Sequence, residues 1–113
     1  MPYGLQRKEL ARIQEVFSRH PQVKEVILYG SRALGTHRKG SDIDITLTGK
    51  GLNLRSLSKI EADLDDLLLP YPFDVSVFRK IENPELRNHI ERVGKVIYRR
   101  DVDLVEDPPD PNA

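Results

Sequence analysis

Two aspartates and a glycine–serine pair are the residues of this sequence best suited to chemistry. Asp42 and Asp44 are two positions apart, and ten residues separate Gly30-Ser31 from Asp42. Residues two apart on a β-strand point to the same face, with Cα atoms about 6–7 Å apart. Carboxylates placed side by side repel each other, so the pair indicates a bound cation or a basic partner. Mg²⁺ is the natural candidate because it takes hard oxygen ligands and shares them with phosphates.

The glycine–serine pair supplies the other half of a nucleotide site. A glycine at the end of a strand allows a sharp turn and a close approach to a ligand. Ser31 offers a hydroxyl group and can begin a helical turn whose free N–H groups face anions. We therefore expect Gly30 and Ser31 to hold phosphate groups. The same segment contains three basic residues that suit a triphosphate. The alternative for each is that it is a plain surface charge: Arg32, Arg38 and Lys39.

A third carboxylate follows in a later segment. In residues 73–78 the alternation places Asp74 and Ser76 on one face and the two valines on the other. On a strand beside Asp42 and Asp44, Asp74 would complete a metal site or accept the proton of an attacking hydroxyl. Two metal ions about 3.5–4 Å apart would then activate that hydroxyl and stabilise a leaving pyrophosphate. The predicted catalytic and metal-binding residues are therefore Asp42, Asp44 and Asp74.

The elements that position these residues follow from apolar spacing and from capping residues. Helical spacing predicts a first helix over 5–19, and a helical turn starts at Ser31. Asn53 is expected to cap a second helix, and Asn83-Pro84 begins a last one that Gly94 ends. Strands are predicted over 26–29, 41–47, 73–78 and 96–98. The apolar stripe of the second helix is Leu54, Leu57, Ile60, Leu64, Leu67 and Leu68.

The remaining titratable residues of the helices carry no predicted role. His20 and His89 are expected to be ordinary helix residues, and His37 is expected on the polar surface. The acidic residues of the second helix are expected to form its solvent-exposed face. They include Asp63, Asp65 and Asp66.

This order of elements predicts an α/β (α+β) fold, a small mixed β-sheet flanked by helices in two or three layers. A length of 113 residues suits one domain, over residues 1–105, and residues 106–113 are expected to be a disordered acidic tail. The longest stretch without Asp, Glu, Lys or Arg spans residues 67–73, which is too short to cross a membrane. With no secretory pattern at residues 1–4, a cytoplasmic location is expected.

The composition limits the kinds of functional site that this protein can form. The sequence has no cysteine, which excludes thiolate metal sites and cysteine nucleophiles. It carries 18 basic and 18 acidic residues, so a strongly basic nucleic-acid surface is not expected.

The segment from Gly30-Ser31 to Asp42-Ile43-Asp44 resembles the signature of the DNA-polymerase-beta-like nucleotidyltransferases, and the short chain resembles the minimal nucleotidyltransferases (MNT proteins). The likeness covers the motifs between Val26 and Asp74, and residues 86–94 look typical of stand-alone members. It implies the fold of the polymerase beta palm, Mg²⁺ on Asp42 and Asp44, and Asp74 as the third carboxylate. It also implies ATP as the nucleotide donor, with phosphates at Gly30 and Ser31.

The resemblance also implies a partner. Larger relatives add domains that bind the base and the acceptor, whereas minimal members pair as antitoxins with helical HEPN toxins and can transfer AMP from ATP onto a toxin tyrosine. The sequence therefore predicts a Mg²⁺-dependent nucleotidyltransferase that modifies a hydroxyl of a partner protein. The alternatives are a steric, nucleotide-binding antitoxin without catalysis, and transfer to a small molecule or RNA end. Nucleotide preference and homo-oligomerisation stay open.

Overall fold

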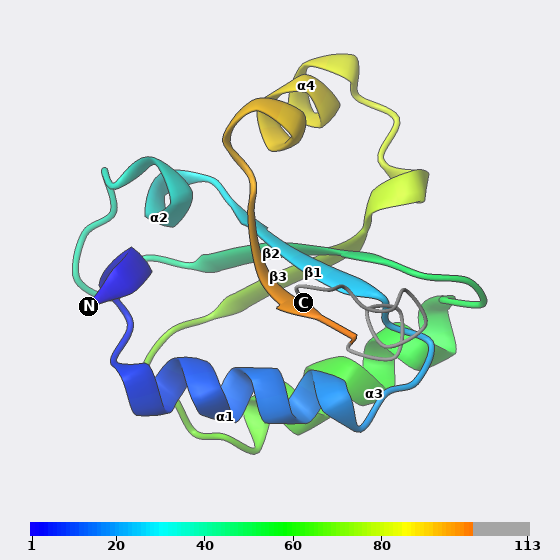
Figure 1. The fold of residues 1–113 in the computed structure, drawn as a ribbon, viewed down its shortest axis with the longest axis horizontal. Coiled ribbons are helices and arrows are strands. Elements are labelled where there is room, and N and C mark those ends of the chain that lie inside the picture. Colours follow the sequence, from blue (N-terminus) through cyan, green and yellow to red (C-terminus); the bar gives the residue numbers. More distant parts are fainter. Residues whose placement is uncertain (101–113) are drawn as a thin grey trace, which may run out of the picture.

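The computed structural model describes residues 1–100, which form one mixed four-stranded sheet with helices on both faces (Figure 1). The strand order is β3-β2-β1-β4. β1 (Glu25–Tyr29) pairs antiparallel with β2 (Ile43–Thr48) and with β4 (Lys95–Arg99), whereas β2 and β3 (Phe73–Val77) run parallel. The predicted domain boundary at 105 and the acidic tail 106–113 lie outside the described residues.

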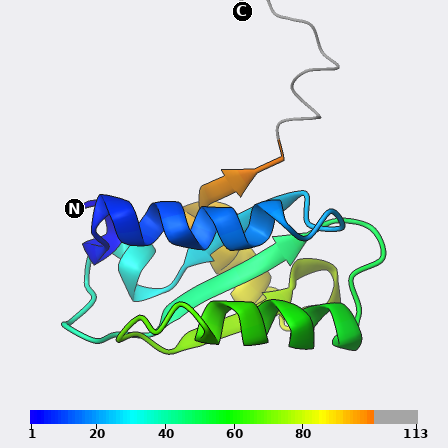
Figure 2. The same cartoon turned by 90° about the horizontal axis from the view of Figure 1, so that it is seen from below.

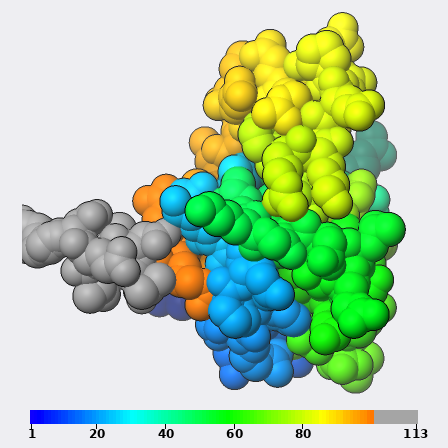
Figure 3. Space-filling view, turned by 90° about the vertical axis from the view of Figure 1, so that its right-hand side faces the viewer, coloured from blue at the N-terminus to red at the C-terminus, as the bar shows by residue number. Residues whose placement is uncertain are grey.

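The helices form two layers with the sheet between them. α1 (Arg7–Ser18) and α3 (Leu54–Asp65) lie side by side across one face (Figure 2). α4 (Pro84–Val93) packs against β1 on the other face, and with the 3₁₀ turn η2 (Phe78–Lys80) it rises as a lobe in the space-filling view (Figure 3). The one-turn helix α2 (Ser31–Leu34) follows β1 directly, and a further 3₁₀ turn, η1 (Pro2–Gly4), precedes α1. The fold is therefore three-layered.

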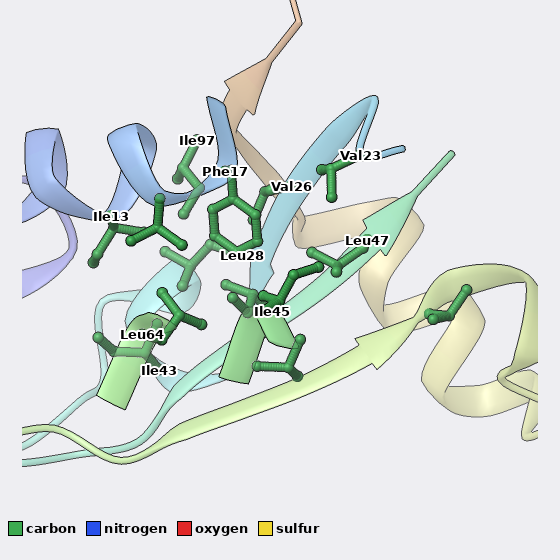
Figure 4. Close-up of a cluster of buried hydrophobic side chains, with 14 of the residues drawn as sticks. Ile13, Phe17, Val23, Val26, Leu28, Ile43, Ile45, Leu47, Leu64 and Ile97 are labelled. Carbon is green, nitrogen blue, oxygen red and sulfur yellow. The ribbon is translucent and has the colours of Figure 1, made fainter. Parts of the chain in front are cut away.

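The alternation of apolar and polar residues along the strands determines which face of the sheet is buried in the apolar core. Ile43, Ile45 and Leu47 of β2 are fully buried against the layer of α1 and α3, where they meet Phe17 and Leu64 (Figure 4). Each such side chain contributes about 1.5–3 kcal/mol of transfer free energy when buried. A shift of one residue in β2 would expose all three, so the core fixes the register of the strand. Asp44 must consequently point to the face of α4.

The predicted helix caps are confirmed. The Asn53 side chain accepts a hydrogen bond from the Ser56 N–H at the start of α3. The Asn83 side chain accepts two, from the N–H groups of Glu85 and Leu86, with Pro84 at the first helical position. These caps satisfy donors that a helix leaves free at its N-terminus.

Part of the predicted apolar stripe of α3 is wrong. Leu54 is 77% exposed and Leu68 is 87% exposed. Leu54 begins the helix beside β3, which is the outer strand of the sheet, so no further strand covers it. α3 ends at Asp65, and Leu68 has a φ of 57°, so the helical spacing no longer places this side chain over the core.

Two of the predictions for polar residues are also corrected. His20 lies in the turn after α1 rather than in a helix, and its Nε2 is 2.8 Å from Asp63 Oδ2. Asp63 is therefore an inter-element contact rather than part of the free outer face of α3. Thr46, two residues after Asp44 in β2, is fully buried and accepts a hydrogen bond from the Ser76 hydroxyl at 2.9 Å. Within residues 1–100, no helix is both long and apolar enough to cross a membrane.

Candidate active site

Three adjacent strands place Tyr29, Asp44 and Asp74 in one row. Tyr29 of β1 is the register partner of Asp44 in β2, and Asp44 is the register partner of Asp74 in β3. Neighbouring strands lie about 4.8 Å apart, so the two carboxylates stand next to each other on the face of α4. Asp42 comes two residues before Asp44, just ahead of β2, and like Asp74 it is exposed. The structure thus brings the three predicted carboxylates to one end of the sheet.

These carboxylates influence each other electrostatically. Partial burial raises the pKa of Asp44, and the charges of Asp74 and Asp42 raise this pKa further. The positive charge of Arg32 acts in the opposite direction with a smaller effect. The ionised form of Asp44 is thus disfavoured by its surroundings, as expected when like charges share a site. A cation placed between the carboxylates would relieve that repulsion.

Tyr29 lies at the inner end of the row and is only 8% exposed. Burial raises the pKa of its phenol, and the charges of Asp74 and Asp44 add to the rise, while a hydrogen bond with Ser76 opposes it. The neutral hydroxyl group is therefore the stable form beside the two carboxylates.

The glycine–serine turn stands directly against Asp44. Gly30 has φ 75° and ψ −154°, a conformation that strongly favours glycine, and it caps α2, which begins at Ser31. A Cβ atom at residue 30 would overlap the carboxylate of Asp44. The absence of a side chain therefore serves both the turn and the close approach, and it sets Ser31 beside the carboxylate row.

Arg32 is buried among backbone carbonyl groups. The residue is 2% exposed, and its guanidinium donates hydrogen bonds to the carbonyl oxygens of Ser41, Asp42 and Tyr3 at 2.8–3.3 Å. It also lies 4.6 Å from the centroid of the Tyr71 ring. These contacts fix the segment that leads into β2, and the contact of Arg32 with phosphate stays a prediction. Arg38 and Lys39 are exposed.

His89 belongs to the site although the sequence assigned it no role. Its Nε2 accepts a hydrogen bond from the Gly30 N–H at 3.1 Å. Its ring meets the Tyr29 ring edge-on, with centroids 6.1 Å apart and an interplanar angle of 79°. No local pattern signals this role, because only the packing of α4 across β1 brings residue 89 to residue 30. A histidine in the helix after the third carboxylate is the one hint the sequence offers.

The donor set suits a hard divalent cation in an open site. Within residues 1–100 no three acidic or histidine side chains are grouped closely enough to form a complete metal cluster. Mg²⁺ commonly binds one or two protein carboxylates and completes its shell with water and substrate phosphates. Asp44 and Asp74, with Asp42 beside them, fit that requirement, and their mutual repulsion gives a physical reason for a cation.

Comparison with known protein families identifies the family of this chain. The family model for polymerase beta nucleotidyltransferases matches residues 11–103. The chain belongs to this family. A search of curated protein sequences gave no match.

Solved structures show the same nucleotidyltransferase fold. A toxin–antitoxin complex with AMP-PNP contains a chain 22% identical to this one, with a TM-score of 0.67 over 83% of this chain and 76% of that chain. A complex of a tri-AMPylated Shewanella oneidensis HEPN toxin with an MNT antitoxin gives 19% identity and a TM-score of 0.63 over 88% and 76%. The toxin–antitoxin complex MntA-HepT gives 19% and 0.63 over 87% and 76%. At these identities the likeness establishes the fold.

Proposed function

We propose that this nucleotidyltransferase moves AMP from ATP onto a hydroxyl group of a partner protein. The observation that carries the proposal is the register pairing of Asp44 with Asp74 beside the Gly30–Ser31 turn. Nucleotidyl transfer requires phosphates to be held next to carboxylates that bind metal and direct the nucleophile. A turn suited to phosphates and carboxylates suited to metal lie together on one face of the sheet, which supports the proposal.

The position of each residue in the site suggests its role in the reaction. The turn at Gly30 and Ser31 holds the phosphates. Asp42, Asp44 and Asp74 would hold Mg²⁺, most simply two ions, and the bound metal would supply neutralisation of phosphate charge and a lower pKa for the attacking hydroxyl. A bond forms between the acceptor oxygen and the α-phosphorus, the bond from that phosphorus to the bridging oxygen breaks, and pyrophosphate leaves. Asp74 is exposed and stands at the outer end of the row, where it can accept the hydroxyl proton.

Arg32 contributes by positioning rather than by charge at the phosphates. Its hydrogen bonds to the carbonyls of Ser41 and Asp42 hold the backbone just before Asp44. Electrostatic catalysis depends on groups that are fixed before the reaction begins. A buried guanidinium with three carbonyl partners supplies that rigidity at the metal-binding end of β2.

The acceptor we propose is a HEPN-type toxin, with this chain as the antitoxin in a cytoplasmic pair. Support comes from the fold shared with an MNT antitoxin solved in complex with a tri-AMPylated HEPN toxin. The complex solved with AMP-PNP supports an adenine nucleotide as the donor.

The test is transfer of label from α-labelled ATP to a co-encoded HEPN-type protein in the presence of Mg²⁺. We expect label on the partner with the wild-type chain, and none with Asp44→Asn or after chelation of the metal. Asp65→Asn is the matched control, because this exposed carboxylate lies on α3, on the opposite face of the sheet. Label that is independent of Asp44 would contradict the proposal.

The second candidate is a steric antitoxin that binds its partner without catalysis. The observation that favours it is the lack of a complete three-ligand metal group in residues 1–100. This candidate function predicts that Asp44→Asn still neutralises the partner, and that neither the wild-type chain nor the variant transfers label to it. Label found only in a small acid-soluble product would instead identify a small-molecule acceptor.

A further inference from the structure

The imidazole of His89 links helix α4 to the glycine–serine turn. The Gly30 N–H donates a hydrogen bond to His89 Nε2 at 3.1 Å, joining residues that are 59 positions apart in the sequence. The same ring packs edge-on against Tyr29, the last residue of β1. His89 thus touches both residues that lead into α2.

The direction of this hydrogen bond defines the state of the ring. An N–H donor at Gly30 requires a lone pair on Nε2, so the imidazole is neutral and carries its proton on Nδ1. A histidine in this tautomer presents a fixed acceptor at the tip of a side chain with only two rotatable bonds. The Tyr29 ring, 6.1 Å away, further limits the orientation of the imidazole.

The turn that receives this contact is one that needs support. Gly30 adopts φ 75° and ψ −154°, while its carbonyl oxygen accepts from the Leu34 N–H at 3.1 Å. Glycine has more backbone freedom than any other residue, so an outside contact that selects one conformation has a large effect there. A rotation at residue 30 would move Ser31 relative to the Asp44 carboxylate, which lies directly against Gly30.

We propose that His89 is a positioning residue of the nucleotide site, and this inference rests on the function proposed above. Its Nε2 holds the Gly30 amide so that the turn and Ser31 are already oriented for the phosphates before ATP arrives. Loss of this acceptor leaves the carboxylates in place but makes the turn adopt several conformations. The consequence is weaker ATP binding, with a smaller effect on the chemical step.

Two other roles for His89 make different predictions. If the imidazole merely fills space under α4, any loss of α4 packing should weaken ATP binding to the same degree. If it competes with phosphate for the Gly30 N–H, removing it should tighten ATP binding. The positioning role alone requires an acceptor at the place of Nε2.

Matched substitutions separate these roles. In His89→Gln the terminal amide oxygen can reach the place of Nε2, whereas in His89→Asn it reaches only the place of Nδ1. His89→Ala removes the acceptor altogether. Ile90→Val loosens the packing of α4 through a side chain that is 3% exposed, and Asn88→Ala changes an exposed neighbour on the same helix.

The measurements are the Kd for AMP-PNP with Mg²⁺ and the KM and kcat for ATP in the transfer assay. We expect His89→Ala and His89→Asn to raise Kd and KM by about three- to tenfold, the range that loss of one hydrogen bond produces, with kcat changed less. His89→Gln should stay within about twofold of wild type. Asn88→Ala and Ile90→Val should leave Kd unchanged, although Ile90→Val lowers the Tm.

Several results would overturn the inference while leaving the proposed function intact. They are an unchanged or lower Kd in His89→Ala, a Gln variant as weak as the Ala variant, or an equal loss in Ile90→Val. A wild-type chain that binds no AMP-PNP would instead refute the function and, with it, this role. Hydrogen exchange of the Gly30 amide without nucleotide reads the contact separately, and it should be faster in the Ala and Asn variants than in the Gln variant.

Discussion

Asp44 of β2 and Asp74 of β3 are direct register partners in the only parallel strand pair within residues 1–100. Parallel pairing sets the amino ends of both strands at the same edge of the sheet, beside the turn that follows β1. Two carboxylates from distant parts of the sequence are thereby held side by side, and burial together with their repulsion raises the pKa of Asp44.

Asp44→Asn should remove activity without damaging the fold. We expect nucleotidyl transfer to fall by at least about 100-fold, the usual scale for losing a group that stabilises charge in the transition state. Thermal unfolding should occur at a slightly higher Tm, because the substitution removes a carboxylate repelled by Asp74 and Asp42. The gain should be below about 1 kcal/mol, since water screens partly exposed charges. Equal losses of stability and activity would contradict the assignment.

The stability of the chain should depend on pH through Asp44 in a defined direction. Its pKa in the folded state is raised above the ordinary value of 3.8, so the folded state takes up this proton first as the pH falls. The contribution of Asp44 is therefore unfavourable at neutral pH and fades as the pH falls through the raised pKa towards 3.8. In urea titrations, the advantage of Asp44→Asn over wild type should shrink over that window. A difference that does not change with pH would disprove the linkage.

Gly30→Ala should be more harmful than Gly35→Ala. Both glycines have a positive φ, 75° and 82° respectively, so each substitution introduces backbone strain of about 1–2 kcal/mol. A Cβ atom at residue 35 meets nothing within 4 Å, whereas one at residue 30 overlaps Asp44. Overpacking adds about 1–3 kcal/mol at residue 30 and displaces the carboxylate. Urea denaturation should show this difference, and only Gly30→Ala should lose nucleotidyl transfer.

Arg32→Lys should destabilise the protein even though the charge is kept. A lysine cannot reproduce the forked donation to the carbonyls of Ser41, Asp42 and Tyr3, so we expect a loss of about 2–4 kcal/mol. Arg38→Lys, at an exposed position of the same segment, is the control and should change stability by less than about 0.5 kcal/mol. A stable Arg32→Lys variant with a raised KM for ATP would instead support a direct contact between Arg32 and the phosphates of ATP.

The carboxylate strand was predictable because its evidence is local. The alternation in residues 41–47 alone decides that Ile43 and Ile45 share one face and Asp44 takes the other, and the structure has that arrangement. The caps at Asn53 and Asn83 were predictable for the same reason, since a cap bonds to N–H groups two or three residues away.

At other positions, long-range packing gave an environment that the local sequence pattern does not predict. Leu54 and Leu68 have helical spacing, but the outer position of β3 and the end of α3 leave them exposed. Arg32 has the charge expected of a phosphate ligand, yet it is buried and donates to carbonyl groups of two separate segments, at Tyr3 and at Ser41-Asp42. Which partners surround a charged side chain depends on the whole chain path, and no spacing rule contains that information.

By itself, the sequence determined which residues are candidates for the site: the Gly30-Ser31 turn and the carboxylates of Asp42, Asp44 and Asp74. These follow from residue type and from periods of two to four residues. Only the tertiary structure decided that Asp74 pairs with Asp44, that Arg32 holds the start of β2, and that His89 reaches the Gly30 amide. The physical reason is that strand order and helix docking depend on burying the apolar faces of the sheet and helices together, and that packing alone brings distant residues into contact.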